Sequence, residues 1–169
     1  WPAQGYNHYG DVDVMVKLQL SEASYFSVAL DNRSNEGART GVVLDTVNNQ
    51  LIVANNLQLQ GFGGGTPAFT AVSGGGPLSL SGVYDRATNP DVYLYIQRNG
   101  NTVNAWLGLA AGGAEIAGSK ITGANITGAN ASGQIVLCNH NGGTPKVDQI
   151  AVWDYNSGWA LSVDNWSEY

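Results

Sequence analysis

Apolar and polar residues alternate along most of the chain, most regularly at residues 11–20 and 91–107. A period of two places successive side chains on opposite faces of a β-strand, so each run predicts a strand with one face in a core. No window of about 10 to 12 residues shows a helical period with caps at its ends. The chain is therefore predicted to be all-β. Further alternating runs cover residues 25–31, 40–45, 50–54, 135–139 and 147–153.

Residues 91–107 are predicted to form a β-hairpin whose tip is Asn99-Gly100. Asn-Gly between two alternating runs is a strong hairpin signal, because a type I′ turn needs a positive φ at both central residues. This tip fixes which residues of the two strands face each other. The predicted cross-strand pairs are Ile96 with Val103, Leu94 with Ala105, Val92 with Leu107, Tyr95 with Asn104, and Tyr93 with Trp106.

One face of this hairpin is aliphatic, and the other carries aromatic rings and amides. Sugars stack their C–H faces on aromatic rings, and amides form hydrogen bonds with sugar hydroxyls. The second face is therefore a candidate carbohydrate-binding surface. The alternative is that glycine-rich loops, the terminal segments or another subunit cover these rings. The candidate ligand-binding residues are Tyr93, Tyr95, Gln97, Asn104 and Trp106.

The length of 169 residues predicts one domain with a hydrophobic core of its own. Residues 1–10 have no period and are predicted to be an N-terminal arm, and residues 11–154 form the predicted domain. Residues 155–169 form an aromatic C-terminal tail with little charge, which we expect to cover part of its own domain or of a neighbouring subunit.

Residues 114–133 divide into four pentads that each end in glycine, as in pentapeptide repeats. Four pentads make about one coil of a square β-helix, and one coil cannot bury its own core. We therefore expect a long loop or an irregular strand, which Ile116, Ile121 and Ile126 attach to the domain. The alternative is an insertion that packs against a neighbouring subunit.

Composition narrows the possible functions. Charged residues make up 12% of the chain, the net charge is −6, and the seven Lys and Arg residues do not cluster. The chain therefore lacks the basic surface with which proteins bind nucleic acids or anionic membranes. Low charge together with 23 glycines is typical of turn-rich, all-β chains. Cys138 is the only cysteine, so an intrachain disulfide and a cysteine-based metal site are excluded.

No catalytic residue is predicted. Glycoside hydrolysis needs two carboxylates at one site, and no glutamate lies in a strand with a second carboxylate at i+2 or i+4. Asp11 and Asp13 share a strand face, where we expect a solvated edge. His8 lies in the arm and His140 in a turn, so both are expected to be surface residues.

No cofactor is predicted, and calcium is the one metal that these loops could hold. A structural calcium ion needs only oxygen ligands, which carboxylates and backbone carbonyls at strand ends supply. The aspartates placed at predicted strand ends are Asp31, Asp45, Asp148 and Asp154.

The order of the strands resembles that of the concanavalin A-like lectin/glucanase superfamily. The hairpin ends in Asn104-Ala-Trp106. A Gly-x-Ile-x-Leu strand follows at residues 133–137 and an Asp-x-Ile-x-Val strand at residues 148–152, an ending similar to that of laminin-G-like jelly-roll modules. The resemblance spans residues 11–154. It implies an antiparallel two-sheet β-sandwich, of which one curved sheet often binds glycans.

Two departures from that superfamily bear on activity. Its glucanase members carry a Glu-x-Asp-x-Glu strand, which this chain lacks, and the absence argues against hydrolase activity. The calcium loops of the superfamily have no clear counterpart either.

A second resemblance is to bacteriophage fibre and capsid-decoration proteins. It rests on the composition, the Ile-Thr-Gly-Ala-Asn repeats and the aromatic tail, and fold alone cannot settle which function follows.

Two functions are therefore predicted. The first is non-catalytic recognition of a glycan or a cell-surface polysaccharide. The alternative is a virion structural protein, a decoration or fibre domain that oligomerises through its terminal arms. Both imply an extracellular or virion-surface location and a homo-oligomer or larger assembly, with no nucleic-acid or membrane partner.

Overall fold

The computed structural model describes residues 7–8, 11–32, 39–57, 68–126, 133–140, 144–155 and 159. These residues form twelve strands and no helix, so no membrane-spanning helix occurs among them. The strands are β1 (Asn7–His8), β2 (Val12–Gln19), β3 (Tyr25–Asn32), β4 (Arg39–Asp45), β5 (Gln50–Leu57), β6 (Thr70–Ala71), β7 (Leu78–Ser79), β8 (Asp91–Asn99), β9 (Thr102–Gly108), β10 (Ile121–Asn125), β11 (Gly133–His140) and β12 (Lys146–Asp154).

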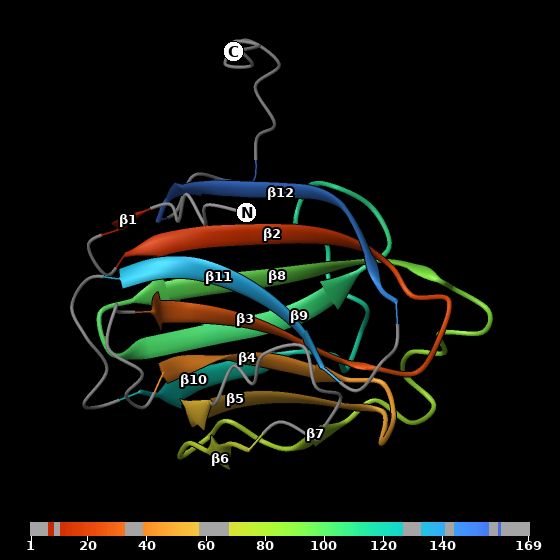
Figure 1. Cartoon of the computed structure of the whole chain (residues 1–169), viewed down its shortest axis with the longest axis horizontal. Helices are drawn as coiled ribbons and strands as arrows, with labels where there is room; N and C mark the ends of the chain where they lie inside the picture. The colour runs from red at the N-terminus through yellow and green to blue at the C-terminus, as the bar shows by residue number, and fades with distance from the viewer. Residues whose placement is uncertain are drawn as a thin grey trace, which may run out of the picture.

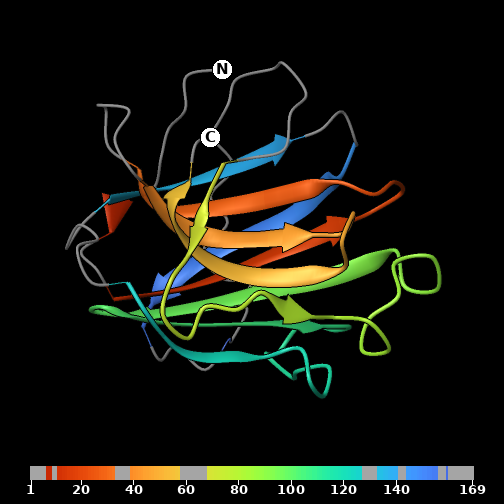
Figure 2. The ribbon, with the colours of Figure 1, turned by 90° about the horizontal axis from the view of Figure 1, so that it is seen from below.

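The strands form two sheets that pack face to face (Figure 1). The seven-stranded sheet has the order β1-β11-β3-β4-β5-β6, with β7 also paired to β5, and the five-stranded sheet has the order β10-β9-β8-β2-β12. All pairings are antiparallel. Figure 2 shows β3, β4 and β5 in one layer and β8, β9 and β10 in the other. The predicted antiparallel two-sheet β-sandwich of the jelly-roll type is confirmed.

The core lies between the sheets and follows from the alternating pattern. Val14, Val16 and Leu94 of the five-stranded sheet meet Val28 and Val42 of the seven-stranded sheet in one buried cluster. Each fully buried side chain of this size contributes about 1.5 to 3 kcal/mol relative to exposure. The outward-facing positions of the same strands are therefore free to carry other chemistry.

The hairpin of β8 and β9 forms as predicted, but its turn lies one residue further along. The central residues are Gly100 and Asn101, and Asn99 pairs with Thr102. Of the two central residues only Gly100 has a positive φ, at 53°. Glycine at the first central position is the arrangement of type II′ turns, whereas the prediction assumed a type I′ turn beginning at Asn99.

This shift changes every predicted pair and leaves the faces intact. Each residue of β8 faces a partner two positions further along β9 than expected, and a shift of two keeps each side chain on its side of the sheet. The predicted pairs were therefore wrong, and the division into an aliphatic and an aromatic face was correct. The observed pairs include Leu94 with Leu107, Tyr93 with Gly108, Ile96 with Ala105, Tyr95 with Trp106, and Gln97 with Asn104.

Residues 114–126 follow the edge of the five-stranded sheet. Ile116 packs against the core, Ile121 and Ile126 are buried in it, and β10 pairs with β9 through a bulge. These three isoleucines therefore attach the described part of the pentad segment to the sandwich. The predicted boundaries at residues 10 and 155 stay predictions, because most of the arm and the tail lie outside the described residues.

Candidate functional site

The outer face of the five-stranded sheet carries two neighbouring rows of side chains that cross the strands β12, β2, β8 and β9. We call the first the aromatic row; it consists of Ala151, Met15, Tyr95 and Trp106, each opposite the next. We call the second the polar row; it lies two residues away on each strand, later on β12 and β8 and earlier on β2 and β9. It consists of Trp153, Asp13, Gln97 and Asn104.

Met15, Tyr95 and Trp106 of the aromatic row are buried although they lie on an outer face, and Ala151 is half-buried. The rings of Tyr95 and Trp106 stack with centroids 5.5 Å apart, and the two residues are 0% and 3% exposed. The ring of Trp159 stands edge-on against both, with centroids 4.9 Å from Tyr95 and 5.4 Å from Trp106. Such edge-to-face contacts add about 0.5 to 1.5 kcal/mol each beyond the area they bury. Trp159 therefore covers the two rings.

The polar atoms of this row are bonded within the protein. The Tyr95 hydroxyl donates to the carbonyl of Ala110 at 2.7 Å, and Nε1 of Trp106 donates to the carbonyl of Gly113 at 2.9 Å. Burial raises the pKa of Tyr95 above its ordinary value of 10. Both acceptors belong to the loop that follows β9, so these bonds hold the loop against the sheet.

Gly113 admits the covering ring. Its φ is 80°, and a Cβ at this position would collide with Cδ1 of Trp159. A residue without a side chain is therefore required where the loop after β9 passes Trp159.

The polar row is arranged differently. Asp13 is 0% exposed, and Nε2 of Gln97 donates to its Oδ1 at 3.2 Å. The side chain of Asn104 accepts the backbone N–H of Gly123 through Oδ1 at 2.8 Å. Gln97, Asn104 and Trp153 are only half-buried. Three groups suited to ligand contact therefore lie around one buried carboxylate.

The expectation that Asp13 lies at a solvated edge was wrong. β2 is an inner strand, paired with β8 on one side and β12 on the other, so Asp13 has Gln97 and Trp153 as direct neighbours. The sequence separates β12 from β2 by more than a hundred residues, and the alternation within one strand does not reveal its neighbours.

Tyr93 lies on the other side of the aromatic row. It is half-buried, and its ring stacks on Tyr95 with centroids 6.2 Å apart. Its cross-strand neighbour on β2 is Lys17, whose Nζ lies 3.0 Å from Oδ2 of Asp148. This hydrogen bond raises the pKa of Lys17. The nearest cation on this side is therefore already paired with a carboxylate.

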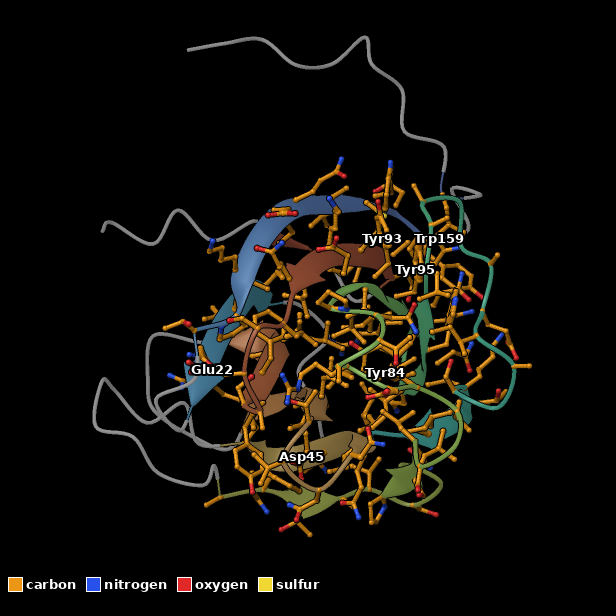
Figure 3. All side chains as sticks on the ribbon, turned by 90° about the vertical axis from the view of Figure 1, so that its right-hand side faces the viewer. Glu22, Asp45, Tyr84, Tyr93, Tyr95 and Trp159 are labelled. Atoms are coloured by element: carbon orange, nitrogen blue, oxygen red, sulfur yellow. The ribbon has the colours of Figure 1, made fainter. Side chains whose placement is uncertain are left out.

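The structure places all five predicted site residues on one face but in two settings. Tyr93, Gln97 and Asn104 are half-buried, whereas Tyr95 and Trp106 lie beneath Trp159. Figure 3 shows Tyr93, Tyr95 and Trp159 close together, apart from Glu22 and Asp45. Trp159 belongs to the predicted C-terminal tail and covers Tyr95 and Trp106. For these two rings the structure therefore agrees with the alternative in which a terminal segment covers them. Asp13 and Trp153 were not among the candidate ligand-binding residues predicted from the sequence, although both stand at outward positions of their alternating runs.

The remaining acidic candidates lie elsewhere. Glu22 and Glu115 are exposed, and Glu115 lies 3.5 Å from Lys120. Asp45 uses Oδ1 to accept the backbone N–H groups of Val47 and Asn48 in the β4–β5 turn. Within the described ranges no three His, Cys, Asp or Glu residues are grouped as metal ligands. The remaining glutamates and the side chains of Asp31, His8 and His140 lie outside the described residues.

Comparison with known proteins supports the fold. No family model matches the sequence, and no curated protein is similar enough in sequence to be called a relative. The carbohydrate-binding module CBM66 from Bacillus subtilis superposes with a TM-score of 0.54 at 10% identity, over 87% of this chain and 76% of that one.

Two other solved structures are similar at lower scores. Chicken galectin 2 gives a TM-score of 0.48 at 12% identity, over 89% of this chain and all of that one. A GH43 glycoside hydrolase gives 0.46 at 16% identity, over 86% of this chain and 29% of that one. The match to the carbohydrate-binding module, which has the highest TM-score of the three, supports the jelly-roll β-sandwich fold of this chain.

Proposed function

We propose that this protein is a non-catalytic module that recognises a glycan or a cell-surface polysaccharide outside the cell. The binding surface is the outer face of the five-stranded sheet. The observation that carries the proposal is the setting of Tyr93, Gln97 and Asn104, which are half-buried beside a rigid support of buried rings. Aromatic and amide groups held in this way suit the C–H faces and hydroxyls of sugars.

The rings of Tyr95 and Trp106 act in this proposal as support. They hold β8 and β9 in place and fix Tyr93, which stacks on Tyr95. The fold shared with a protein named as a carbohydrate-binding module is consistent with this role. A fold hosts many functions, so the proposal depends on the residues of the face.

Electrophoresis through gels that contain neutral polysaccharides, together with a glycan array, tests the proposal. The protein should be retarded by at least one polysaccharide, and a variant with both Gln97→Ala and Asn104→Ala should lose most of the retardation. Thr70→Ala is the matched control, because Thr70 is an exposed residue on β6 of the other sheet. Retention by the double variant equal to that of the control would contradict this choice of face.

The virion alternative gains no support from the structural matches, and the same preparation tests it. It predicts no glycan binding and a stable oligomer in light scattering that dissociates when residues 155–169 are removed. Release of reducing ends from a polysaccharide would overturn the non-catalytic part of the proposal.

A further inference from the structure

Gln97 and Asn104 stand directly opposite each other on β8 and β9, and each amide is held at one end. The partner of Gln97 is a carboxylate oxygen of Asp13, which can only accept, so Gln97 must turn its NH₂ group inward. The partner of Asn104 is the N–H of Gly123, which can only donate, so Asn104 must turn its carbonyl oxygen toward it. The chemistry of the partners therefore fixes the orientation of both amides.

The opposite ends of the two amides are left for a ligand. Gln97 presents Oε1, an acceptor, and Asn104 presents Nδ2, a donor. Neither atom has a hydrogen-bond partner in the part of the chain that the structure describes. Side chains directly opposite on antiparallel strands have Cβ atoms about 4.5 to 5.5 Å apart. The polar row thus displays one acceptor and one donor side by side.

Resting on the proposed function, we propose that this pair reads two adjacent hydroxyl groups of a neutral glycan. One hydroxyl donates to Oε1 of Gln97, and its neighbour accepts from Nδ2 of Asn104. A hydroxyl can both donate and accept, so a pair of neighbouring hydroxyls satisfies both amides at once.

Anionic groups fit this arrangement poorly. A carboxylate or sulfate offers only acceptor atoms, so it leaves Oε1 of Gln97 without a donor. It would also approach the Asp13 carboxylate. Lys17 and Lys120 lie beside the aromatic row, and each is already paired: Lys17 with Asp148, and Lys120, whose Nζ lies 4.6 Å from the ring centroid of Trp106, with Glu115. The chain as a whole carries a net charge of −6. These charges select neutral glycans over uronic or sulfated ones.

The rest of the row sets the length of the site. Asp13 is a positioning residue, which holds the Gln97 amide and does not itself touch the ligand. Trp153 stands at the far end, three strands away from Asn104, or about 14 Å at the usual strand spacing. The row is therefore long enough for more than one sugar ring. The indole of Trp153 is half-buried and contacts the ring of Trp159 edge-on, with centroids 5.6 Å apart, so only its uncovered part can meet a C–H face.

Calorimetry with the best neutral oligosaccharide from the array and its monodeoxy analogues tests the inference. Removing either of two adjacent hydroxyls should weaken binding to the native protein roughly tenfold, because a tenfold change in affinity corresponds to the net contribution of one hydrogen bond. Gln97→Met should be insensitive to loss of one of these hydroxyls, and Asn104→Ala to loss of its neighbour, as expected for directly coupled groups. Asn101→Ala, at the exposed tip of the same hairpin, is the control and should respond like the native protein.

Asp13→Asn tests the positioning role of Asp13 in the same calorimetric comparison of the parent glycan with its deoxy analogues. It should weaken binding of the parent glycan and have no effect on the analogue that lacks the hydroxyl bound by Gln97. A merely structural defect would weaken both equally, and the unfolding midpoint of each variant reports such a defect separately.

The outcomes separate the two proposals. Absence of binding to every glycan overturns the proposed function and this inference with it. Binding in which no deoxy analogue couples to Gln97 or Asn104, or a preference for sulfated or uronic glycans, overturns the inference alone. Coupling of the two amides to adjacent hydroxyls supports it.

Discussion

The aromatic row and the polar row lie on the same four strands, two residues apart, and differ in what they leave unsatisfied. In the aromatic row the hydroxyl of Tyr95 and the indole N–H of Trp106 are both bonded to the loop after β9, and Trp159 covers the rings. In the polar row Gln97 and Asn104 are bonded at one end only. The first row is therefore a second core on an outer face, and the second row is a surface prepared for a partner.

Aromatic character alone therefore does not mark the proposed recognition surface. Tyr95 and Trp106 are two of the three aromatic candidates from the sequence, and they are the most completely buried of the five. The half-buried amides beside them have the polar atoms that a ligand can reach.

The largest expected effect is on stability in the aromatic row. Trp106→Ala removes a buried indole and its hydrogen bond to Gly113 and should lower the free energy of unfolding by about 3 to 5 kcal/mol. Trp153→Ala, the matched change in the polar row, should cost less, because this ring is half-buried and its ring contact in the described part of the chain is with Trp159. Denaturant unfolding of both variants measures the difference, and equal losses would contradict the distinction between the rows.

Gly113→Ala should displace the covering ring. Its Cβ would collide with Trp159, so we expect a loss of about 1 to 3 kcal/mol beyond that of Gly112→Ala. Gly112 is the matched control because its φ of 106° is also positive and nothing lies within 4 Å of a Cβ there. Tryptophan emission should shift to the red only in Gly113→Ala. The same emission and stability in both variants would mean that Trp159 does not require this glycine.

Tyr95→Phe should have a smaller effect. It removes the hydrogen bond to Ala110 and keeps the ring, so the expected loss is about 0.5 to 1.5 kcal/mol. Tyr93→Phe removes a hydroxyl of a half-buried ring and should change the free energy of unfolding by less than about 0.5 kcal/mol. A greater loss of unfolding free energy in Tyr93→Phe than in Tyr95→Phe would contradict the account, because it would mean that the hydroxyl of Tyr93, and not that of Tyr95, stabilises the fold.

The pH dependence of stability gives the smallest effect. The pKa of Tyr95 is raised in the folded protein, so its contribution is fully present below about pH 10 and is lost as the pH rises through the folded value. The stability gap between the native chain and Tyr95→Phe should therefore narrow above about pH 10. Burial raises the pKa of Tyr84 to about 12, and this group contributes equally in both proteins. A gap that stays constant in unfolding titrations up to about pH 12 would contradict the burial of Tyr95.

The strands and their two faces could be predicted from the sequence, because a period of two both indicates a strand and assigns each side chain to one of its faces. Residues 11–20 show this most clearly, since Val14 and Val16 alternate with Asp13 and Met15. A period of two does not fix the register, which at Gly100 depends on the turn type that glycine adopts.

The order of strands in the sheets is also absent from local patterns. The polar row exists because β2 lies between β8 and β12, which brings together residues 13, 97 and 153. Burial of the aromatic row depends on Trp159, whose sequence context is an aromatic tail with no indication of where it packs. The sequence therefore predicted the face and its residue types, and it could not predict which of them would be covered.

Side-chain signals of ¹⁵N-labelled protein during titration with the best-binding neutral oligosaccharide test the central claim most directly. The structure predicts that the NH₂ signals of Gln97 and Asn104 shift while the indole N–H signal of Trp106, bonded to Gly113, stays in place. A shift of the Trp106 signal with both amide signals unchanged would show that the aromatic row meets the ligand and would contradict the claim.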